Sequence, residues 1–485
     1  MRVGTPVNAA QDTEPGADKL HQVRVFESGL APADPVAVAT IETAVPADIV
    51  APPVVLPDFH HKGDLEMPSS IAIATSETIN PRFTSSSVNC GMALIALDAP
   101  VPDRRAIESF YRIVRERFPH PPRSRPELSV REVRRAATYG AEFAAERFDA
   151  DGADLERIEN GGRLDLEPFG GPAALRAVVP RLTMQLSRLR FGTVGPSNHF
   201  LELQEVEELL DPDAARVLGV EAGQLVIQYH AGGGVLTGQI GRLFARRKKA
   251  SKALRAQMAV QKPLFHLSRA RSIGEARRRM SLFFDESCPP VPRFGPEGRQ
   301  VMLANSAAMN YGFAFRVATY AALQRAARAT LGSETSRLVV DSPHNSIYEE
   351  EIGGRPALVH RHNSCRAYPA SRMTPGTAFG EVGQALLLPG TNRTSSYLCV
   401  AGSHAERSLY SACHGAGTMI EEFEDRGLSR EDPRGRRTLR FRYSDSAPVE
   451  VPHLDDRGVD AALSVLSTNG LVRPVARMRP LAVLT

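Results

Sequence analysis

The chain has few cysteines and no long apolar run, and both shortages limit what kind of protein it can be. Its five cysteines are an odd number and lie far apart in the sequence. This pattern does not fit a disulfide-built scaffold and favours a reducing compartment. No apolar stretch approaches the roughly 18 residues that span a bilayer, and the first sixteen residues lack the features of a secretory signal. We therefore expect a soluble, cytoplasmic protein with no membrane partner.

Composition excludes the disordered and fibrous classes. Hydrophobic residues make up 42% of the chain and charged residues 24%, which is typical of a globular protein. Its 485 residues could form two or more domains, but the sequence shows no internal repeat and no obvious linker. Residues 1–21 are polar and interrupted by proline and glycine, so we predict a flexible N-terminal tail followed by one domain over residues 22–485.

Positive charge is concentrated in one part of the chain, although the formal net charge is only +4. Such a density suits contact with a phosphate backbone, and the alternative is a solvated helix face. The residues concerned are Arg242, Arg246, Arg247, Lys248, Lys249, Lys252 and Arg255, followed by Arg269, Arg271, Arg277, Arg278 and Arg279.

Apolar periodicity predicts a mixture of helices and strands. We expect helices over residues 128–147, 175–189, 241–262 and 301–329, and strands over 385–388 and 397–400. Two further strands, 225–227 and 338–340, are expected to end close to His230 and His344. Strands and helices do not alternate regularly, which favours an α+β fold: one large mixed domain with peripheral helices around a central site.

Five short segments place a thiol or an imidazole beside small or flexible residues. They contain Cys90, His199, His230, His344 and His414. Taken singly, a buried cysteine is commonly inert packing and a histidine at a strand end is commonly structural. Taken together, they predict convergent ligands for a transition metal such as manganese, iron, cobalt or zinc.

These segments resemble, in order, those of the RtcB-type RNA ligases, and the similarity runs from about Val23 to the C-terminus. Gly192-Thr193-Val194-Gly195-Pro196-Ser197-Asn198-His199-Phe200-Leu201-Glu202 is similar to that family's Gly-Thr-Leu-Gly-x-x-Asn-His-Phe-x-Glu segment. The other segments that carry the resemblance are Leu56-Pro57-Asp58-Phe59-His60, Asn89-Cys90-Gly91-Met92, the loop beginning at His230, His344-Asn345, Val359-His360-Arg361, Pro389-Gly390 with Ser395-Ser396-Tyr397, and Cys413-His414-Gly415-Ala416-Gly417.

The resemblance implies a GTP- and manganese-dependent ligase that joins RNA 3′-phosphate or 2′,3′-cyclic phosphate ends to 5′-hydroxyl ends, as in tRNA splicing or RNA repair. His414 would carry the nucleotide as a guanylylated histidine. The residues Cys90, His199, His230 and His344 would hold two manganese ions, and the nucleotide would be bound by Asn198, Glu202, Ser396, Gly415 and Gly417. RNA ends are the implied partner, with an accessory activating protein as a further partner.

The same resemblance gives three other positions alternative roles. Arg361 would contact RNA phosphates, or it pairs with a structural carboxylate. Asp58 and His60 would orient the ligands, or they form a turn.

The sequence also departs from the family pattern at four positions. Ser87 replaces an aspartate three residues before the metal-binding cysteine, Gly234 and Thr418 replace arginines, and the chain ends at Leu484-Thr485 instead of Lys-Gly. These departures define an alternative, a ligation-deficient relative that binds metal and RNA ends in a regulatory role. A metallohydrolase acting on a small phosphoester is a third interpretation.

Overall fold

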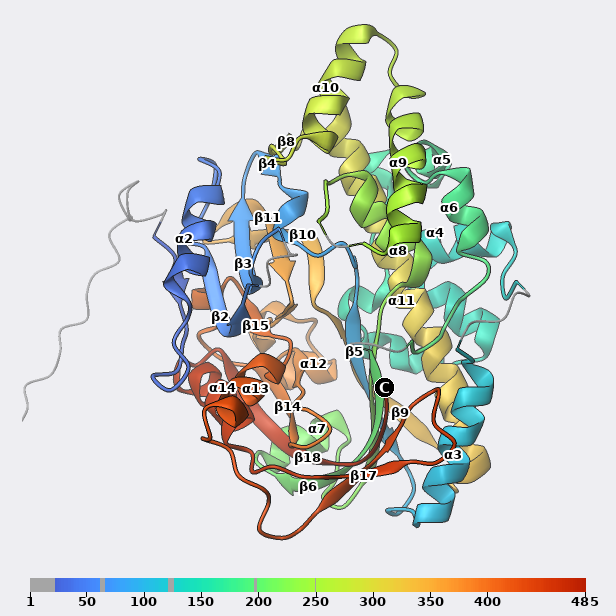
Figure 1. Ribbon diagram of the computed structural model, residues 1–485, viewed down its shortest axis with the longest axis vertical. Coiled ribbons are helices and arrows are strands. Elements are labelled where there is room, and N and C mark those ends of the chain that lie inside the picture. Colours follow the sequence, from blue (N-terminus) through green and yellow to red (C-terminus); the bar gives the residue numbers. More distant parts are fainter. Residues whose placement is uncertain (1–21, 62–65, 121–125, 196–198, 249) are drawn as a thin grey trace, which may run out of the picture.

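The computed structural model describes residues 22–61, 66–120, 126–195, 199–248 and 250–485. The predicted tail, residues 1–21, lies outside the described residues. Within them, mixed sheets and peripheral helices confirm the α+β class (Figure 1). No helix in these ranges is both long and apolar enough to cross a membrane.

A large, almost entirely antiparallel sheet forms the centre of the molecule. Its strands follow the order β13-β14-β18-β6-β7-β5-β9, and β16 and β17 extend it from β18. The strand bounds are β5 (Gly91–Leu97), β6 (Phe200–Leu209), β7 (Leu225–Ala231), β9 (Ser336–Pro343), β13 (Ala385–Leu388), β14 (Ser396–Ala401), β16 (Arg437–Phe441), β17 (Val449–Pro452) and β18 (Val472–Leu484).

A second sheet has the order β1-β2-β3-β11-β10, and two strand pairs lie beside the sheets. Its bounds are β1 (Arg24–Val25), β2 (Val54–His60), β3 (Ser69–Thr75), β10 (Asn345–Ile352) and β11 (Arg355–His362). One pair joins β4 (Thr78–Ile79) to β8 (Val291–Pro292), and the other joins β12 (Ser364–Arg366) to β15 (Ser411–Cys413).

The helices lie mainly at the periphery (Figure 1). Helices α3 (Arg104–Arg117), α4 (Val130–Phe148), α5 (Leu175–Val178), α6 (Arg181–Leu186), α8 (Gly234–Leu243), α9 (Lys252–Leu267), α10 (Ile273–Phe284) and α11 (Pro296–Thr330) form one group. The others are α2 (Pro35–Ala44), α7 (Pro212–Leu218), α12 (Ala378–Val382), α13 (Gly417–Asp425) and α14 (Arg457–Thr468).

Helix α11 is the central helix of the fold. It is buried on all sides along most of its 35 residues, and its many alanines allow α3, α4 and α8 to pack closely against it. A helix that is buried on all sides belongs to the protein core. Its side chains join those of the large sheet in the main hydrophobic cluster.

Most predicted elements are confirmed, with two corrections. The helix expected over residues 175–189 is two short helices, α5 and α6, because Pro180 lacks the N–H that would continue the first one. The basic helix expected over 241–262 is also wrong as one element: α8 ends at Leu243, and α9 begins at Lys252 with Ser251 as its cap. The strands that end near His230 and His344 form as expected.

Candidate functional site

Four neighbouring strands of the large sheet place four of the predicted ligands side by side at one end of the strands. His199 precedes β6, His230 lies near the end of β7, Cys90 precedes β5 and His344 follows β9. Because adjacent strands run antiparallel, the start of one strand lies beside the end of the next. The register confirms this, since Phe200 pairs with His230 and Gly91 pairs with Pro343.

Cys90, His199 and His230 form a group with metal-binding geometry. The Cys90 sulfur lies 3.1 Å from Nε2 of His230 and 3.5 Å from Nε2 of His199. One ligand atom from each residue lies within 4.8 Å of the other two. A thiolate and two imidazoles are common ligands of borderline divalent cations.

His344 and His414 extend this group into the cavity. The ring centroid of His344 lies 4.9 Å from that of His230 and 4.5 Å from that of His414. Nδ1 of each of these two residues is buried without a hydrogen-bond partner in the described structure. A buried ring nitrogen without a partner is energetically unfavourable unless it binds a ligand or a cation.

Burial keeps these imidazoles uncharged. Burial lowers the pKa of His199 to about 4, and the nearby Arg190 contributes to this shift. It also lowers the pKa of His414 to about 4, with a contribution from His60. The pKa of His344 is lowered well below its usual value. At neutral pH the rings therefore carry free lone pairs. Burial raises the pKa of the Cys90 thiol to about 12, so the thiol stays protonated until a cation displaces its proton.

A buried ionic network fixes the backbone that carries Cys90. Asn89 has a left-handed φ of 56°, and its carbonyl oxygen and side-chain oxygen accept hydrogen bonds from the Arg316 guanidinium at 2.5 and 2.8 Å. Arg316 also pairs with Asp341 at 2.7 Å, and both side chains are almost fully buried. A Cβ at Gly91 would lie 2.8 Å from both Arg316 Cζ and the backbone oxygen of Ser342, so this close approach requires glycine there.

The group opens into a cavity of about 600 Å³. The lining includes ionisable side chains that were not expected at the site from the sequence, namely Glu66, Arg242, Arg247, His362 and Glu421. Arg242 could have been identified, because it lies on α8, the helix that begins shortly after His230. The others come from segments whose position depends on tertiary packing.

The predicted nucleotide-binding residues occupy two places. Gly415 and Gly417 line the cavity beside His414. Glu202 and Ser396 are buried together behind it, since the Gln204 amide donates to Glu202 at 2.5 Å and to Ser396 at 3.1 Å. Neither belongs to the cavity lining as far as the structure describes it. Asn198 lies outside the described residues.

The four departures from the family pattern are all in structured positions. Ser87 lines the cavity, and its carbonyl accepts from the Cys90 N–H at 3.1 Å. Thr418 also lines the cavity, with its hydroxyl 3.1 Å from Nδ1 of His60. Gly234 begins α8 with φ of 65°, a conformation that disfavours an arginine. Thr485 follows β18 and donates to the Phe441 carbonyl.

Arg361 is a structural residue. Its side chain is fully buried, and its guanidinium binds Glu350 at 2.5 and 3.0 Å and Ser411 at 2.8 Å. The expectation that it contacts RNA is therefore wrong, and the carboxylate pair is what forms. Asp58 and His60 line the cavity, and Asp58 accepts from the Met419 N–H near the start of α13, so both support the loop that carries His414.

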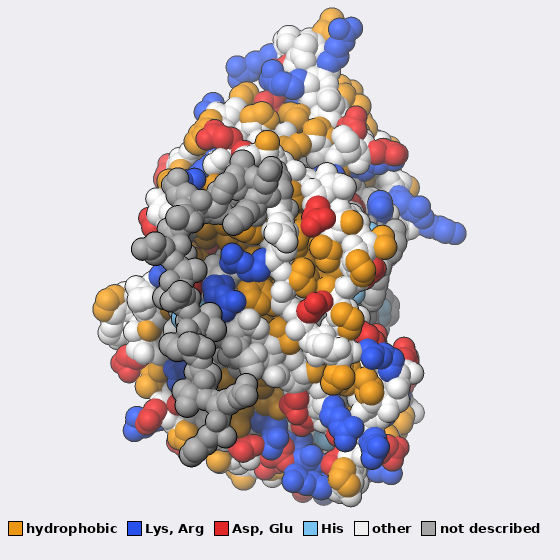
Figure 2. Space-filling view, turned by 90° about the vertical axis from the view of Figure 1, so that its left-hand side faces the viewer, with side chains coloured by type: hydrophobic (Ala, Val, Ile, Leu, Met, Phe, Trp, Pro, Cys, Tyr) orange, Lys and Arg blue, Asp and Glu red, His pale blue; other side chains and the backbone are white. Residues whose placement is uncertain are grey.

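The basic stretch is not one surface. Arg247 and Arg279 are buried, whereas Arg271, Arg277 and Arg278 are exposed. Figure 2 shows Lys and Arg side chains gathered at the narrow upper end of the molecule, where α9 and α10 project (Figure 1).

A cavity that combines a Cys/His cation group, uncharged imidazoles and guanidinium groups is typical of metal-dependent enzymes that act on phosphate esters. The model of one family, described as tRNA-splicing ligase RtcB, matches residues 38–485. The chain therefore belongs to this family.

Relatives in archaea and bacteria are similar over most of this chain. The tRNA-splicing ligase RtcB of Thermococcus kodakarensis is 26% identical over 89% of this chain and 86% of its own length. The RNA-splicing ligase RtcB of Mycobacterium tuberculosis is 29% identical over 71% of this chain and 74% of its own. The tRNA-splicing ligase RtcB of Pyrococcus abyssi is 29% identical over 81% of this chain. The match covers 42% of that relative's own length.

Proposed function

We propose that this protein is an RNA ligase that joins a 3′-phosphate or 2′,3′-cyclic phosphate end to a 5′-hydroxyl end, with GTP as the energy source. The observation that carries the proposal is the convergence of Cys90, His199, His230, His344 and His414 on one cavity from five separate segments. Membership of the family supports the reaction class.

The residues present fit a divalent cation. Cys90, His199 and His230 would hold it, and the unpartnered Nδ1 of His344 is a further donor. For a second ion the donors are fewer, because Ser87 stands where a carboxylate would supply a hard oxygen. A bound manganese ion would neutralise charge on phosphate oxygens and polarise them.

His414 supplies the nucleophile in this proposal. Its uncharged ring nitrogen attacks the α-phosphorus of GTP, an N–P bond forms, and the bond to the pyrophosphate oxygen breaks while the ring loses its N–H proton. An oxygen of the RNA 3′-phosphate then takes the GMP group, and the N–P bond breaks while the ring regains a proton from solvent. The 5′-hydroxyl finally attacks the activated 3′-phosphorus, releases GMP and loses its proton. Division into steps converts a poor leaving group into a good one.

Arg242 is the guanidinium group that we assign to phosphate oxygens in the cavity. It lines the cavity beside the histidines, whereas the buried Arg247 donates to the carbonyl oxygens of Thr84 and Pro81. Arg242 lies two turns along α8 from Gly234, the position where the family resemblance leads us to expect an arginine. A guanidinium in a partly enclosed cavity binds a phosphate oxyanion strongly. We infer that Arg242 takes the role of the missing side chain.

A labelling experiment tests the proposal. The protein is incubated with GTP labelled at the α-phosphate and with manganese chloride, denatured, and separated by electrophoresis. We expect a label that acid removes, since a phosphoramidate hydrolyses in acid, and we expect none in His414→Ala. The matched control is His404→Ala, because His404 is 61% exposed in its side chain and lies outside the cavity lining.

Two outcomes would contradict this function. One is a folded, metal-loaded protein that forms no adduct with GTP, which would favour the ligation-deficient relative. The other is turnover of a phosphoester without a covalent label, which would favour a hydrolase. Joining of an RNA with a 3′-phosphate to one with a 5′-hydroxyl, lost in His414→Ala, would complete the support.

A further inference from the structure

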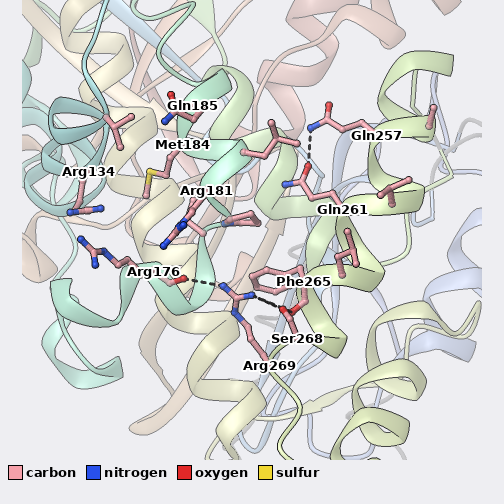
Figure 3. A pocket seen from close by; sticks show the side chains of 17 residues that line it. Arg134, Arg176, Arg181, Met184, Gln185, Gln257, Gln261, Phe265, Ser268 and Arg269 are labelled. Atoms are coloured by element: carbon pink, nitrogen blue, oxygen red, sulfur yellow. Dashed lines mark hydrogen bonds between the residues drawn. The ribbon is translucent and has the colours of Figure 1, made fainter.

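A second cavity lies away from the catalytic group, between helix α9 and the helices α4, α5 and α6 (Figure 3). Its volume is about 960 Å³, larger than that of the catalytic cavity. We name it the helix groove and define it by its apolar residues Leu182, Val260, Leu264 and Phe265 and its arginines Arg134, Arg176, Arg181 and Arg269. The proposed reaction uses none of these residues.

Aliphatic side chains are unusually exposed in the helix groove. Val260 and Leu264 on α9 are 62% and 64% exposed, and Leu182 on α6, across the groove, is 48% exposed. Val260 and Leu264 are four residues apart, so they lie on the same face of α9. Contiguous apolar surface that is rimmed by polar groups marks an interaction site.

The charge around this apolar surface has one sign. Four arginines line the helix groove, and its described lining contains no aspartate or glutamate. Figure 3 shows Arg134, Arg176 and Arg181 on the side facing α9. In the described part of the chain no carboxylate pairs with any of these three, and the buried Nε of Arg134 has no hydrogen-bond partner. The groove therefore complements a ligand with negative charge.

The aliphatic surface favours a peptide over RNA as the ligand of the helix groove. Single-stranded RNA is held by exposed aromatic rings on which bases stack. The one aromatic residue in the described lining, Phe265, is 3% exposed and is covered by the Arg269 guanidinium at 4.1 Å from the ring centroid. Leucine and valine side chains instead fit the apolar face of an amphipathic helix.

We propose that the helix groove binds an amphipathic helix of a partner protein, with leucine-like side chains packed on Leu182, Val260 and Leu264 and with acidic residues paired to the arginines. Helix α9 connects this surface to the catalytic cavity. Its cap, Ser251, lines the catalytic cavity, and its later turns line the groove. A bound partner would thus contact the helix that borders the reaction site.

Binding of designed peptides to the full-length protein tests the proposal. The probe is a fluorescein-labelled 16-residue helical peptide with leucine at positions i, i+4, i+7 and i+11 and glutamate along both edges. The matched control peptide has lysine in place of each glutamate. Fluorescence anisotropy should show the acidic peptide binding at least about tenfold more tightly than the basic one at moderate salt.

Variants then locate the binding. Leu264→Ser and Arg181→Glu should each weaken the binding of the acidic peptide at least about fivefold. The first removes an apolar contact, and the second reverses a charge. The control variants are Ile273→Ser, a 75% exposed apolar residue outside the groove, and Arg105→Glu, an exposed arginine on α3. Both should bind as the wild type does. Circular dichroism and the thermal midpoint verify that all four variants are folded.

Five outcomes would overturn the proposal. Equal binding of the acidic and basic peptides, or no binding of either, would remove the charge argument. Binding that Leu264→Ser and Arg181→Glu leave unchanged would place the peptide elsewhere. Displacement of the peptide by a short RNA would make the surface a nucleic-acid site. Tighter peptide binding after deletion of residues 2–21, which contain Asp12, Glu14 and Asp18, would assign the groove to the chain's own N-terminal segment.

Discussion

The sulfur of Cys90 lies 3.1 Å from Nε2 of His230, although 140 positions separate the two residues in the sequence. The large sheet brings them together, because Met92 on β5 pairs directly with His230 on β7. The candidate metal group is thus a consequence of strand register. A slip of one residue would turn these side chains to opposite faces of the sheet.

Removal of the thiol should abolish tight metal binding. In Cys90→Ala we expect the affinity for manganese or zinc to fall by one to two orders of magnitude, because the group would keep two imidazoles without the anionic ligand. Isothermal titration of the metal-free protein measures this. Cys288→Ala is the control, since Cys288 is also buried but lies outside the cavity lining. Unchanged affinity in Cys90→Ala would show that the cation binds elsewhere.

Loss of the Arg316 charge should destabilise the fold. Arg316→Met would leave Asp341 buried without its ion-pair partner, so we expect the free energy of unfolding to fall by about 3–5 kcal/mol. Urea denaturation followed by circular dichroism measures the change. In the control, Arg163→Met removes a half-exposed pair with Glu142 and should cost less than about 1 kcal/mol. Equal effects of the two substitutions would contradict the structural role of Arg316.

The sequence contained enough to predict much of the site and the class of fold. Small residues follow His230 and precede His344, and the apolar runs before them end as strands, so both histidines could be expected at strand ends. The order of strands β6, β7, β5 and β9 could not be read from these local patterns. Register and neighbours in a sheet depend on pairing between distant segments, and no single run of residues encodes them.

The basic residues whose roles the sequence left open show the same limit. Arg361 and Arg247 are basic residues in segments that suggested phosphate contact, yet Arg361 is buried against Glu350 and Arg247 donates to the carbonyl oxygens of Pro81 and Thr84. Charge along a sequence does not distinguish an exposed guanidinium from one that satisfies buried oxygens. Pro180 gave a local signal that should have divided the helix predicted over 175–189.

Substitution of Arg242 should weaken phosphate binding while the fold is kept. In Arg242→Ala we expect the KM for GTP or for the RNA 3′-phosphate to rise about tenfold, because a guanidinium contact to a phosphate in a partly buried cavity is lost. Steady-state ligation assays with each substrate varied separately measure it. Arg105→Ala on α3 is the matched control and should behave as the wild type does. An unchanged KM for both substrates would remove Arg242 from the phosphate site.

The buried carboxyl of Glu202 should make stability depend on pH. Burial raises its pKa from 4.5 to about 8, so between these values the native protein holds a proton that the unfolded chain has released. The contribution of this group is therefore fully present below about pH 4.5 and is lost as pH rises towards 8. In Glu202→Gln this loss is absent, so the variant should gain stability relative to the wild type as pH rises, by about 2–4 kcal/mol at pH 8. Thermal unfolding from pH 5 to pH 8 measures the difference, with the half-exposed Glu208→Gln as control. A difference that does not grow with pH would show that Glu202 is ionised in the native protein at neutral pH.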